Sequence, residues 1–298
     1  MWGGRMTGHR RPPLPVRDGV GPARLRLHGG NVAAEFERRF GAGAMVLAGE
    51  IVTADGSVVR ADAELPAGSV VYFYRELPDE VEVPFGIPVL YRDQNILVVD
   101  KPHFLATMPR GGHVAQTALV RLRRELGLPE LSPAHRLDRL TAGVLVFTIR
   151  RQVRGRYQML FARGSVTKTY LARSSITPGV TTSLLVSNRI VKHRGVLQAS
   201  IESGPVNART RIEPLGEGHY RLLPSTGRTH QLRVHMAAIG MPIDNDPLYP
   251  RVRDVAAEDF TNPLTLVAYE LAFTDPICGT PRHFRSTRSV EAGACEAS

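Results

Sequence analysis

Short strand-like runs dominate the chain from Ile87 onward, and they constrain the fold more than any other feature. Apolar runs bounded by turn residues are predicted as strands at "IPVLYRD", "NILVVDKP", "AGVLVFTI", "TKTYLARSSI", "HYRLLPS" and "LTLVAYELAF". Helical spacing predicts three helices, at "VAQTALVRLRREL", "QVRGRYQMLF" and "THQLRVHMAAI". This mixture predicts a large, mainly antiparallel α+β domain.

A smaller unit is predicted before this domain. The segment "AAEFERRF" reads as a short helix, and brief strands follow with turns at Asp55-Gly56 and Ala67-Gly68. Acidic residues and prolines then cluster in "YRELPDEVEVPFGIP", as they do in linkers, which puts the boundary near Pro84. We therefore expect a disordered basic tail over 1–15, a small α+β module over 16–80, the main domain over 85–290 and a frayed end over 291–298.

Composition indicates an ordinary globular protein. With 298 residues, 43% hydrophobic and 22% charged, the chain can bury one large core or two domains. It has no apolar run of the length that a signal peptide or a membrane span needs, so a cytoplasmic location is expected. The only two cysteines, Cys278 and Cys295, form no CxxC pair, which fits a reducing compartment without disulfides.

The charge of the chain is strongly basic. Thirty-eight basic against 28 acidic residues give a net charge of +10 and an isoelectric point near 10.2. Between Arg150 and Arg173 there are seven basic residues and no acidic one. This run fits either a polyanionic partner or an arginine-rich solvated surface, and composition leaves both possibilities open.

The stretch "AHRLDRLTAGVLVF" (134–147) holds the most informative single residue. Asp138 stands between two arginines, directly before a predicted strand, so a loop can present it at the edge of a sheet. Nearby guanidinium groups favour the charged form of a carboxyl, and we expect Asp138 to be ionised. In isolation, an RLDR tetrapeptide is also explained by a loop ion pair.

Three motifs in a fixed order carry a resemblance to a known family. "HRLDRLTAG" is followed by "KTYLA" (168–172) and then by "STGRTHQLRVHMAAIGMPIDNDPLYP" (225–250), and together they resemble the RluA-type pseudouridine synthases. The likeness extends over about residues 85 to 287, including "ILVVDKP" before the aspartate and "ELAFTDP" near the end. The preceding segment 46–76 resembles a small ribosomal-protein-like RNA-binding module.

The resemblance implies an RNA isomerase. Conversion of uridine to pseudouridine breaks the carbon–nitrogen glycosidic bond, turns the uracil and rejoins it through carbon, which needs no cofactor, metal or external donor. The family uses one aspartate, and Asp138 matches it, as nucleophile or base at the sugar. Tyr170 matches the active-site tyrosine that stacks on the detached base, although a tyrosine packed in the core is the alternative. The arginine partner of the aspartate corresponds to Arg233, with Arg228 as second choice.

RNA contacts are also implied. Arg136 matches the arginine that helps to take the target nucleotide out of its stack. His135 is expected to orient the loop, with a purely structural histidine as the alternative. The set of expected RNA-contacting residues is Arg136, Arg228, His135, Arg139, Lys168 and Thr229.

The turn before the last predicted helix has two explanations. Free N–H groups of residues 226–229 can hold an RNA phosphate, or Ser225 or Thr226 can cap the helix. His230 and His235 suggest a metal, but their spacing of five residues separates them around a helix, and no zinc site is predicted.

Two positions depart from the family pattern. Ala142 stands where serine is usual, and Asn245-Asp246 stands where glycine-aspartate is usual, in a turn whose glycine can allow positive φ; asparagine tolerates that conformation better than most residues. Neither change removes an expected catalytic group. The sequence therefore predicts a monomeric RNA pseudouridine synthase that acts on ribosomal or transfer RNA, without membrane or metal.

Two other functions are possible from parts of this pattern. A non-catalytic RNA-binding protein could use the same basic cleft, but it would not need Asp138 and Tyr170. A hydrolase with paired carboxylates would need a second acid, and these motifs contain none in a suitable place.

Overall fold

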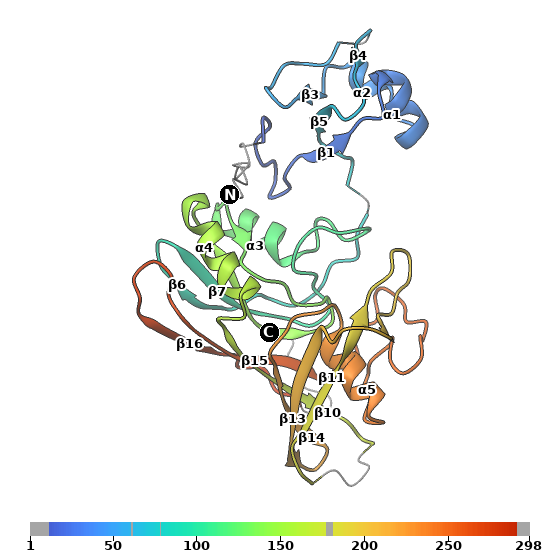
Figure 1. Ribbon diagram of the computed structural model, residues 1–298. Helices are drawn as coiled ribbons and strands as arrows, with labels where there is room; N and C mark the ends of the chain where they lie inside the picture. Colours follow the sequence, from blue (N-terminus) through green and yellow to red (C-terminus); the bar gives the residue numbers. More distant parts are fainter. Residues whose placement is uncertain (1–11, 61, 78, 177–180, 291–298) are drawn as a thin grey trace, which may run out of the picture. The chain divides into compact units, whose positions relative to one another are not determined.

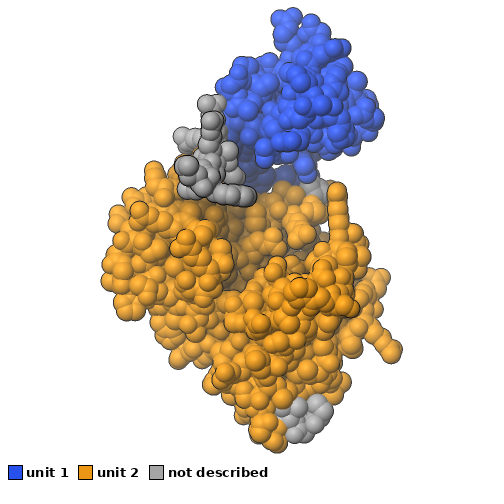
Figure 2. Space-filling view, viewed as in Figure 1, with its two compact units in different colours: residues 1–78 blue, residues 79–298 orange. Residues whose placement is uncertain are grey.

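The computed structural model describes residues 12–60, 62–77, 79–176 and 181–290 (Figure 1). The chain divides into two compact units, residues 1–78 and 79–298, which Figure 2 colours separately. The predicted tail over 1–15 lies mostly outside the described residues, and the predicted frayed end over 291–298 lies wholly outside them. The carbonyl of Pro15, inside the described part, accepts a hydrogen bond from the Tyr74 hydroxyl at 2.7 Å. None of the described helices is long and apolar enough to cross a membrane.

The first unit is a small α+β structure. Its strands form a three-stranded sheet, in the order β1-β5-β3, and a two-stranded sheet of β2 and β4. Its elements are β1 (Ala23–Arg26), β2 (Gly30–Asn31), α1 (Val32–Phe40), α2 (Ala44–Leu47), β3 (Val52–Thr53), β4 (Glu64–Leu65) and β5 (Val70–Phe73). Asn31 caps α1 by accepting from the Ala34 N–H at 2.9 Å, and Gly41 ends the helix in the left-handed conformation. Phe36 of α1 and Phe73 of β5 meet edge to face in the core of the unit.

The second unit is built on one large sheet. Among the described residues this sheet has eleven strands, with the main order β12-β11-β13-β14-β10-β15-β9-β7-β6, while β16 pairs with β15 and β8 with β9. Every pairing is antiparallel except that of β15 with β9. The predicted α+β domain with a mainly antiparallel sheet is therefore confirmed. The strands are β6 (Val89–Arg92), β7 (Ile96–Lys101), β8 (Ser132–Pro133), β9 (Ala142–Thr148), β10 (Thr167–Arg173), β11 (Leu184–Val191), β12 (Ser200–Glu202), β13 (Ala208–Gly216), β14 (His219–Pro224), β15 (Leu266–Thr274) and β16 (Pro281–Arg285).

Helices cover both faces of this sheet. They are α3 (Ala118–Leu126), α4 (Arg151–Ala162) and α5 (Gln231–Ala238). Leu97 and Val99 of β7 share one apolar cluster with α3 and α5, whereas Ile96 and Val98 share another with α4. Because neighbouring strand residues point to opposite faces, α4 lies on the face opposite α3 and α5.

Two local features show how the sequence sets these elements. The predicted helix over 114–126 begins only at Ala118, because the Glu80 carboxylate accepts the N–H groups of residues 114–116 and Thr117 caps the helix. Gly143, at the start of β9, has φ of +112°, and a Cβ there would lie 2.2 Å from the Ala268 carbonyl oxygen. Only glycine allows β9 to approach β15 so closely.

Candidate active site

The loop that carries Asp138 links β8 to β9 and is held through its backbone. The Thr107 hydroxyl donates to the Leu137 carbonyl at 2.8 Å and accepts from the Leu137 N–H at 3.1 Å. His103 Nδ1 lies 2.8 Å from the Leu140 carbonyl oxygen. These contacts fix the backbone on both sides of Asp138.

Buried Lys101, at the end of β7, also holds this loop. Its ammonium group donates to the carbonyls of Pro102 and Leu105 at 2.8 and 2.7 Å and to that of Arg139 at 3.3 Å. Burial lowers the pKa of Lys101 well below its ordinary value. The loop is therefore positioned by neighbouring side chains and does not depend on an ion pair of Asp138.

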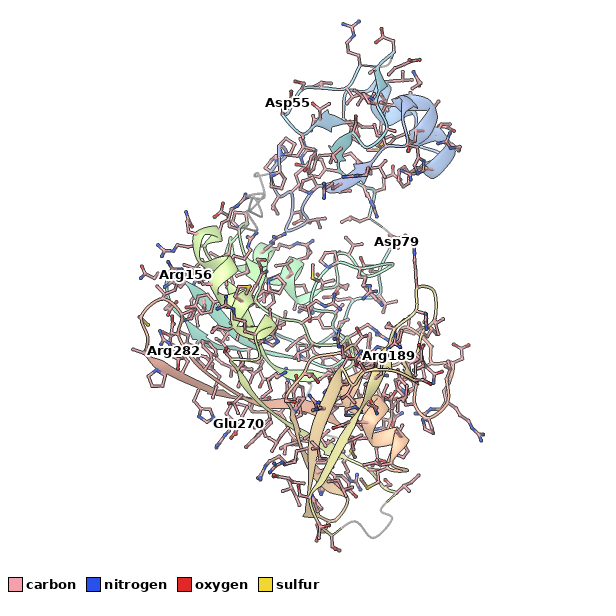
Figure 3. The ribbon with its side chains drawn as sticks, in the orientation of Figure 1. Asp55, Asp79, Arg156, Arg189, Glu270 and Arg282 are labelled. Carbon is pink, nitrogen blue, oxygen red and sulfur yellow. The ribbon has the colours of Figure 1, made fainter. Side chains whose placement is uncertain are left out.

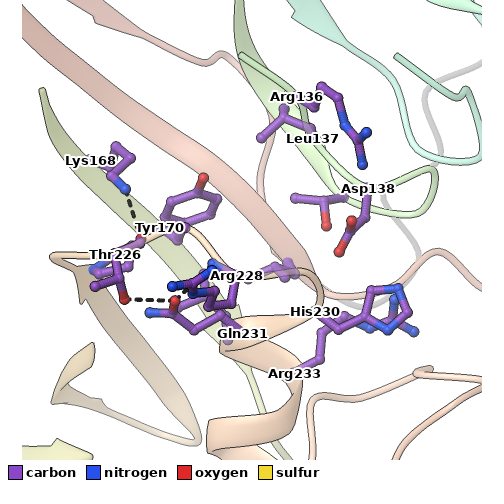
Figure 4. A pocket seen from close by; sticks show the side chains of 15 residues that line it. Arg136, Leu137, Asp138, Lys168, Tyr170, Thr226, Arg228, His230, Gln231 and Arg233 are labelled. Atoms are coloured by element: carbon purple, nitrogen blue, oxygen red, sulfur yellow. Dashed lines mark hydrogen bonds between the residues drawn. The ribbon is translucent and has the colours of Figure 1, made fainter. Parts of the chain in front are cut away.

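Asp138 and Tyr170 border the same cavity, of about 110 Å³ (Figure 4). Other residues that line it are Arg136, Lys168, Thr226, Arg228, His230 and Arg233. A second cavity, of about 490 Å³, shares Arg136, Asp138, His230 and Arg233 with the first and adds Arg139, Lys192 and Thr229. Residues far apart in the sequence thus meet around Asp138.

Tyr170 reaches the cavity from β10. The pairing of β10 with β15 shifts register between Thr169 and Tyr170, and the ring of Tyr170 packs against the main apolar cluster of the unit. Burial, and secondly the negative charge of Asp138, raise the pKa of the Tyr170 hydroxyl. The phenol is therefore neutral at physiological pH, as both a stacking role and a core role require.

Lys168 lines the cavity two residues before Tyr170. Its ammonium group donates to the Thr226 carbonyl at 2.9 Å, and burial lowers its pKa. Arg136 is exposed and borders both cavities, and Arg139 lines the larger one. Burial, and secondly the charge of Arg233, lower the pKa of Arg139.

Arg233 is buried in α5 and forms a bidentate ion pair with Asp246. Arg233 Nε lies 2.7 Å from Asp246 Oδ2, and Nη2 lies 2.6 Å from Oδ1. Burial works against the charge of Arg233, but Asp246, and less strongly Asp138, raise its pKa above the ordinary value. Among the described residues neither Arg233 nor Arg228 is ion-paired with Asp138, so the expected direct pair is wrong for this structure.

The turn that makes this ion pair possible was predicted correctly. Asn245 has φ of +61°, the left-handed conformation expected for this position. The next residue, Asp246, then also accepts the N–H groups of Leu248 and Tyr249 at 2.8 and 3.2 Å. Asp246 therefore lies where α5 and this turn meet, and it takes the charge of Arg233.

The turn before α5 is held by Gln231. Its side-chain oxygen accepts from the Thr226 hydroxyl at 2.7 Å and from the Arg228 N–H at 3.0 Å. The N-cap residue of α5 is His230, which makes no side-chain capping bond. Capping by Ser225 or Thr226 is therefore wrong, and phosphate binding by this turn stays a prediction.

His135 lies outside both cavities. Its ring stacks on Phe161 of α4 with centroids 4.2 Å apart, and its Nε2 accepts from the Val146 N–H at 3.2 Å. Burial, and secondly the charge of Lys168, lower its pKa to about 3. These contacts with α4 and β9 fit the structural alternative, and the expected RNA contact by His135 stays a prediction.

The two other histidines considered for a metal lie in different surroundings. His235 is buried and bonded to Thr210 and Asn188, whereas His230 borders the cavities. Within the described ranges, no group of three or more histidine, cysteine or acidic side chains is placed to hold a metal ion. Sequence reasoning did not identify His230 and Asp246 as parts of the site, although both lie inside the quoted third motif.

Comparisons with known proteins match this chain to RNA pseudouridine synthases. The family model described as RNA pseudouridylate synthase matches residues 95–238. The dual-specificity RNA pseudouridine synthase RluA of Yersinia pestis is 32% identical over 209 residues, which cover 66% of this chain and 97% of that protein. The ribosomal large subunit pseudouridine synthase D of Pseudomonas aeruginosa is 30% identical over 229 residues, covering 72% of this chain and 71% of the relative.

A solved structure shows the same fold. The human RNA pseudouridylate synthase domain containing 1 matches with a TM-score of 0.54 and 25% identity, covering 70% of this chain and 86% of that one. Fold, site and sequence together define an RNA-modifying isomerase. The chain belongs to the RluA-type family of RNA pseudouridine synthases.

Proposed function

We propose that Asp138 is the carboxylate that acts on the sugar of the target uridine, as nucleophile or base. The observation that carries this proposal is that Asp138 and Tyr170, from separate motifs, border one small cavity. A water molecule takes up about 30 Å³ of the liquid, so this cavity of about 110 Å³ has room for a group larger than a water molecule. The detached uracil stacks on the Tyr170 ring while Asp138 faces the sugar.

The charges around Asp138 support this role. It is the only carboxylate between Glu130 and Glu202 in the sequence, a stretch that contains twelve lysines and arginines. Arg136, Arg139 and Arg233 line the cavities around it. Such surroundings attract the phosphate backbone of RNA while one anionic side chain is left for the chemistry.

Arg136 is proposed to stabilise the flipped state of the nucleotide. The anomeric carbon is inaccessible inside a helix, and flipping costs a few kcal/mol. Arg136 is exposed where the two cavities meet, so its guanidinium plane can fill the space that the base leaves. Lys168, Arg139, Arg228 and Thr229 are proposed to contact the flanking RNA.

The substrate is proposed to be ribosomal or transfer RNA. Relatives are named for both classes. One is the mitochondrial tRNA pseudouridine(32) synthase of Saccharomyces cerevisiae, which is 31% identical to this chain over 206 residues. The match covers 43% of that synthase. The unit over residues 1–78 is proposed to bind RNA beside the catalytic unit. We further propose that the protein acts as a monomer in the cytoplasm, without a metal.

The test uses RNA labelled with tritium at carbon 5 of uracil. Wild-type protein is expected to release tritium and to form pseudouridine, whereas Asp138→Asn is expected to bind the same RNA within a few-fold and to release none. Free uracil in place of pseudouridine would indicate a hydrolase. RNA binding without any reaction, across candidate ribosomal and transfer RNAs, would indicate a non-catalytic binding protein.

A further inference from the structure

One proton of the reaction has no acceptor among the roles assigned above. When the C1′–N1 bond breaks and the C1′–C5 bond forms, C5 still carries its hydrogen. That proton must leave C5 so that its bonding electrons return to the uracil ring, and N1 gains a proton. If the proposed function holds, a group beside the cavity must take the C5 proton.

Most groups around the cavity are poorly suited to this step. The neutral phenol of Tyr170 has a raised pKa and is a weak base at neutral pH. The arginines are fully protonated, and the Lys168 ammonium is engaged with the Thr226 carbonyl. Asp138 is already assigned to the sugar.

His230 has the geometry that the step requires. It lines both the cavity that holds Tyr170 and the larger cavity beside it, and Figure 4 shows its ring on the same side of the site as Asp138. Its Nδ1 lies 3.0 Å from the Tyr249 hydroxyl, and the two rings meet edge to face. No described residue hydrogen-bonds its Nε2. One ring nitrogen is therefore anchored, and the other is available to the cavity.

The hydrogen bonds of Tyr249 indicate which nitrogen carries the proton. The Tyr249 hydroxyl accepts from the Ala199 N–H at 2.6 Å and donates to the Ala199 carbonyl at 3.1 Å. We assign that hydrogen to the Ala199 carbonyl, so that the bond to His230 has Nδ1–H as the donor. Nε2 then carries the lone pair, which is the form needed in a base.

We propose that Nε2 of His230 removes the C5 proton after the C1′–C5 bond has formed. The C–H electron pair returns to the uracil ring, and His230 becomes an imidazolium ion. The larger cavity, which His230 also lines, connects this nitrogen to water, so the proton passes to solvent and the neutral ring is restored.

The surroundings of His230 keep it neutral before the step. Burial is the main cause that lowers its pKa below 6.5. The charged groups that act on it are Asp138 and Asp246, which favour the imidazolium form, and Arg233 and Lys192, which oppose it. The base form therefore predominates at pH 7, and kcat is expected to fall only as the pH drops below 6.5.

Two substitutions test the assignment. His230 has φ of +58°, so His230→Gly suits the backbone and also leaves a space that free imidazole can enter. His230→Gln retains a polar side chain that cannot accept the proton, and it covers the case in which the glycine variant does not fold. His283→Gln, at an exposed histidine on β16, is the matched control.

We expect kcat of both His230 variants to fall by about 10²-fold or more, with unchanged affinity for RNA. Imidazole is expected to rescue His230→Gly in proportion to its unprotonated form. RNA carrying deuterium at C5 is expected to react more slowly than unlabelled RNA with the His230 variants, because proton removal then limits the rate.

Near-normal kcat in both variants would overturn the proposal. So would a loss of activity with neither imidazole rescue nor a C5 isotope effect, because that pattern belongs to a structural histidine or to Asp138 as the base. An inactive wild-type protein would instead refute the proposed function, and this inference with it.

Discussion

Substitution of Asp246 by asparagine should destabilise the catalytic unit strongly. The Asp246 side chain is fully buried, and that of Arg233 is 3% exposed. Four hydrogen bonds end on the Asp246 carboxylate, two from the Arg233 guanidinium and two from the N–H groups of Leu248 and Tyr249. Asparagine can retain the backbone bonds, but it leaves the guanidinium charge buried without a counter-ion.

The expected loss follows from that imbalance. Breaking a buried ion pair by removing one partner costs about 3–5 kcal/mol. Because asparagine retains the bonds from the two backbone N–H groups, we expect the lower end, about 3 kcal/mol in the free energy of unfolding. For a chain of this size that corresponds to a fall of about 6–12 °C in Tm.

The assay is urea unfolding followed by circular dichroism. Arg285→Gln is the matched control, because it removes one charge from an exposed ion pair, with Glu270, and should cost less than about 1 kcal/mol. The double variant Arg233→Met/Asp246→Asn should recover most of the stability, since it removes the unpaired buried charge and keeps the acceptor for the N–H groups of Leu248 and Tyr249. It should still lack activity. A loss below about 1 kcal/mol for Asp246→Asn would refute the reasoning.

Three further outcomes are expected. Tyr170→Phe keeps the stacking ring and loses the hydroxyl, so it should bind RNA normally but turn over more slowly, because the neutral phenol can donate a proton to N1 of the detached base; full activity would show that the hydroxyl is dispensable. Arg156→Gln/Arg163→Gln removes two exposed arginines, one in α4 (Figure 3) and one directly after it, and should flatten the dependence of log Kd on log salt by about 1.4 if each arginine contacts one phosphate. The control Arg221→Gln/Arg285→Gln removes the same charge from exposed ion pairs, and an equal effect would indicate net charge alone. Deletion of the first unit should flatten the same slope and leave activity at saturating RNA intact; an unfolded product would mean that this unit belongs to the catalytic core.

Strands that are buried over their whole length were the easiest to predict from the sequence. β7 and β9 are buried throughout, so their apolar runs stand out in the sequence. β11 and β13 were not predicted, because polar and charged residues interrupt the apolar ones along both. In β13 the signal was present: Ala208, Thr210 and Ile212 are buried and the residues between them are exposed.

The sequence predicted which residues meet at the candidate site better than it predicted how they pair. Motif order brought Asp138, Tyr170, Arg136 and Lys168 to one place, and the structure has all four on one cavity. The ion-pair partner of Arg233 could not be predicted from the order of the motifs. The ion pair of Arg233 with Asp246 depends on the turn geometry after α5, which spacing along the chain does not encode.

In this site the carboxylate that stabilises the fold, Asp246, is a different residue from the carboxylate proposed to react, Asp138. An aspartate locked in an ion pair would have to break it in order to react. Here the charge of Arg233 is taken by Asp246, and the loop backbone is held by Thr107, His103 and Lys101. Among the described residues Asp138 therefore has no ion pair to break. It follows that Asp138→Asn should cost activity with little loss of stability, whereas Asp246→Asn should cost both.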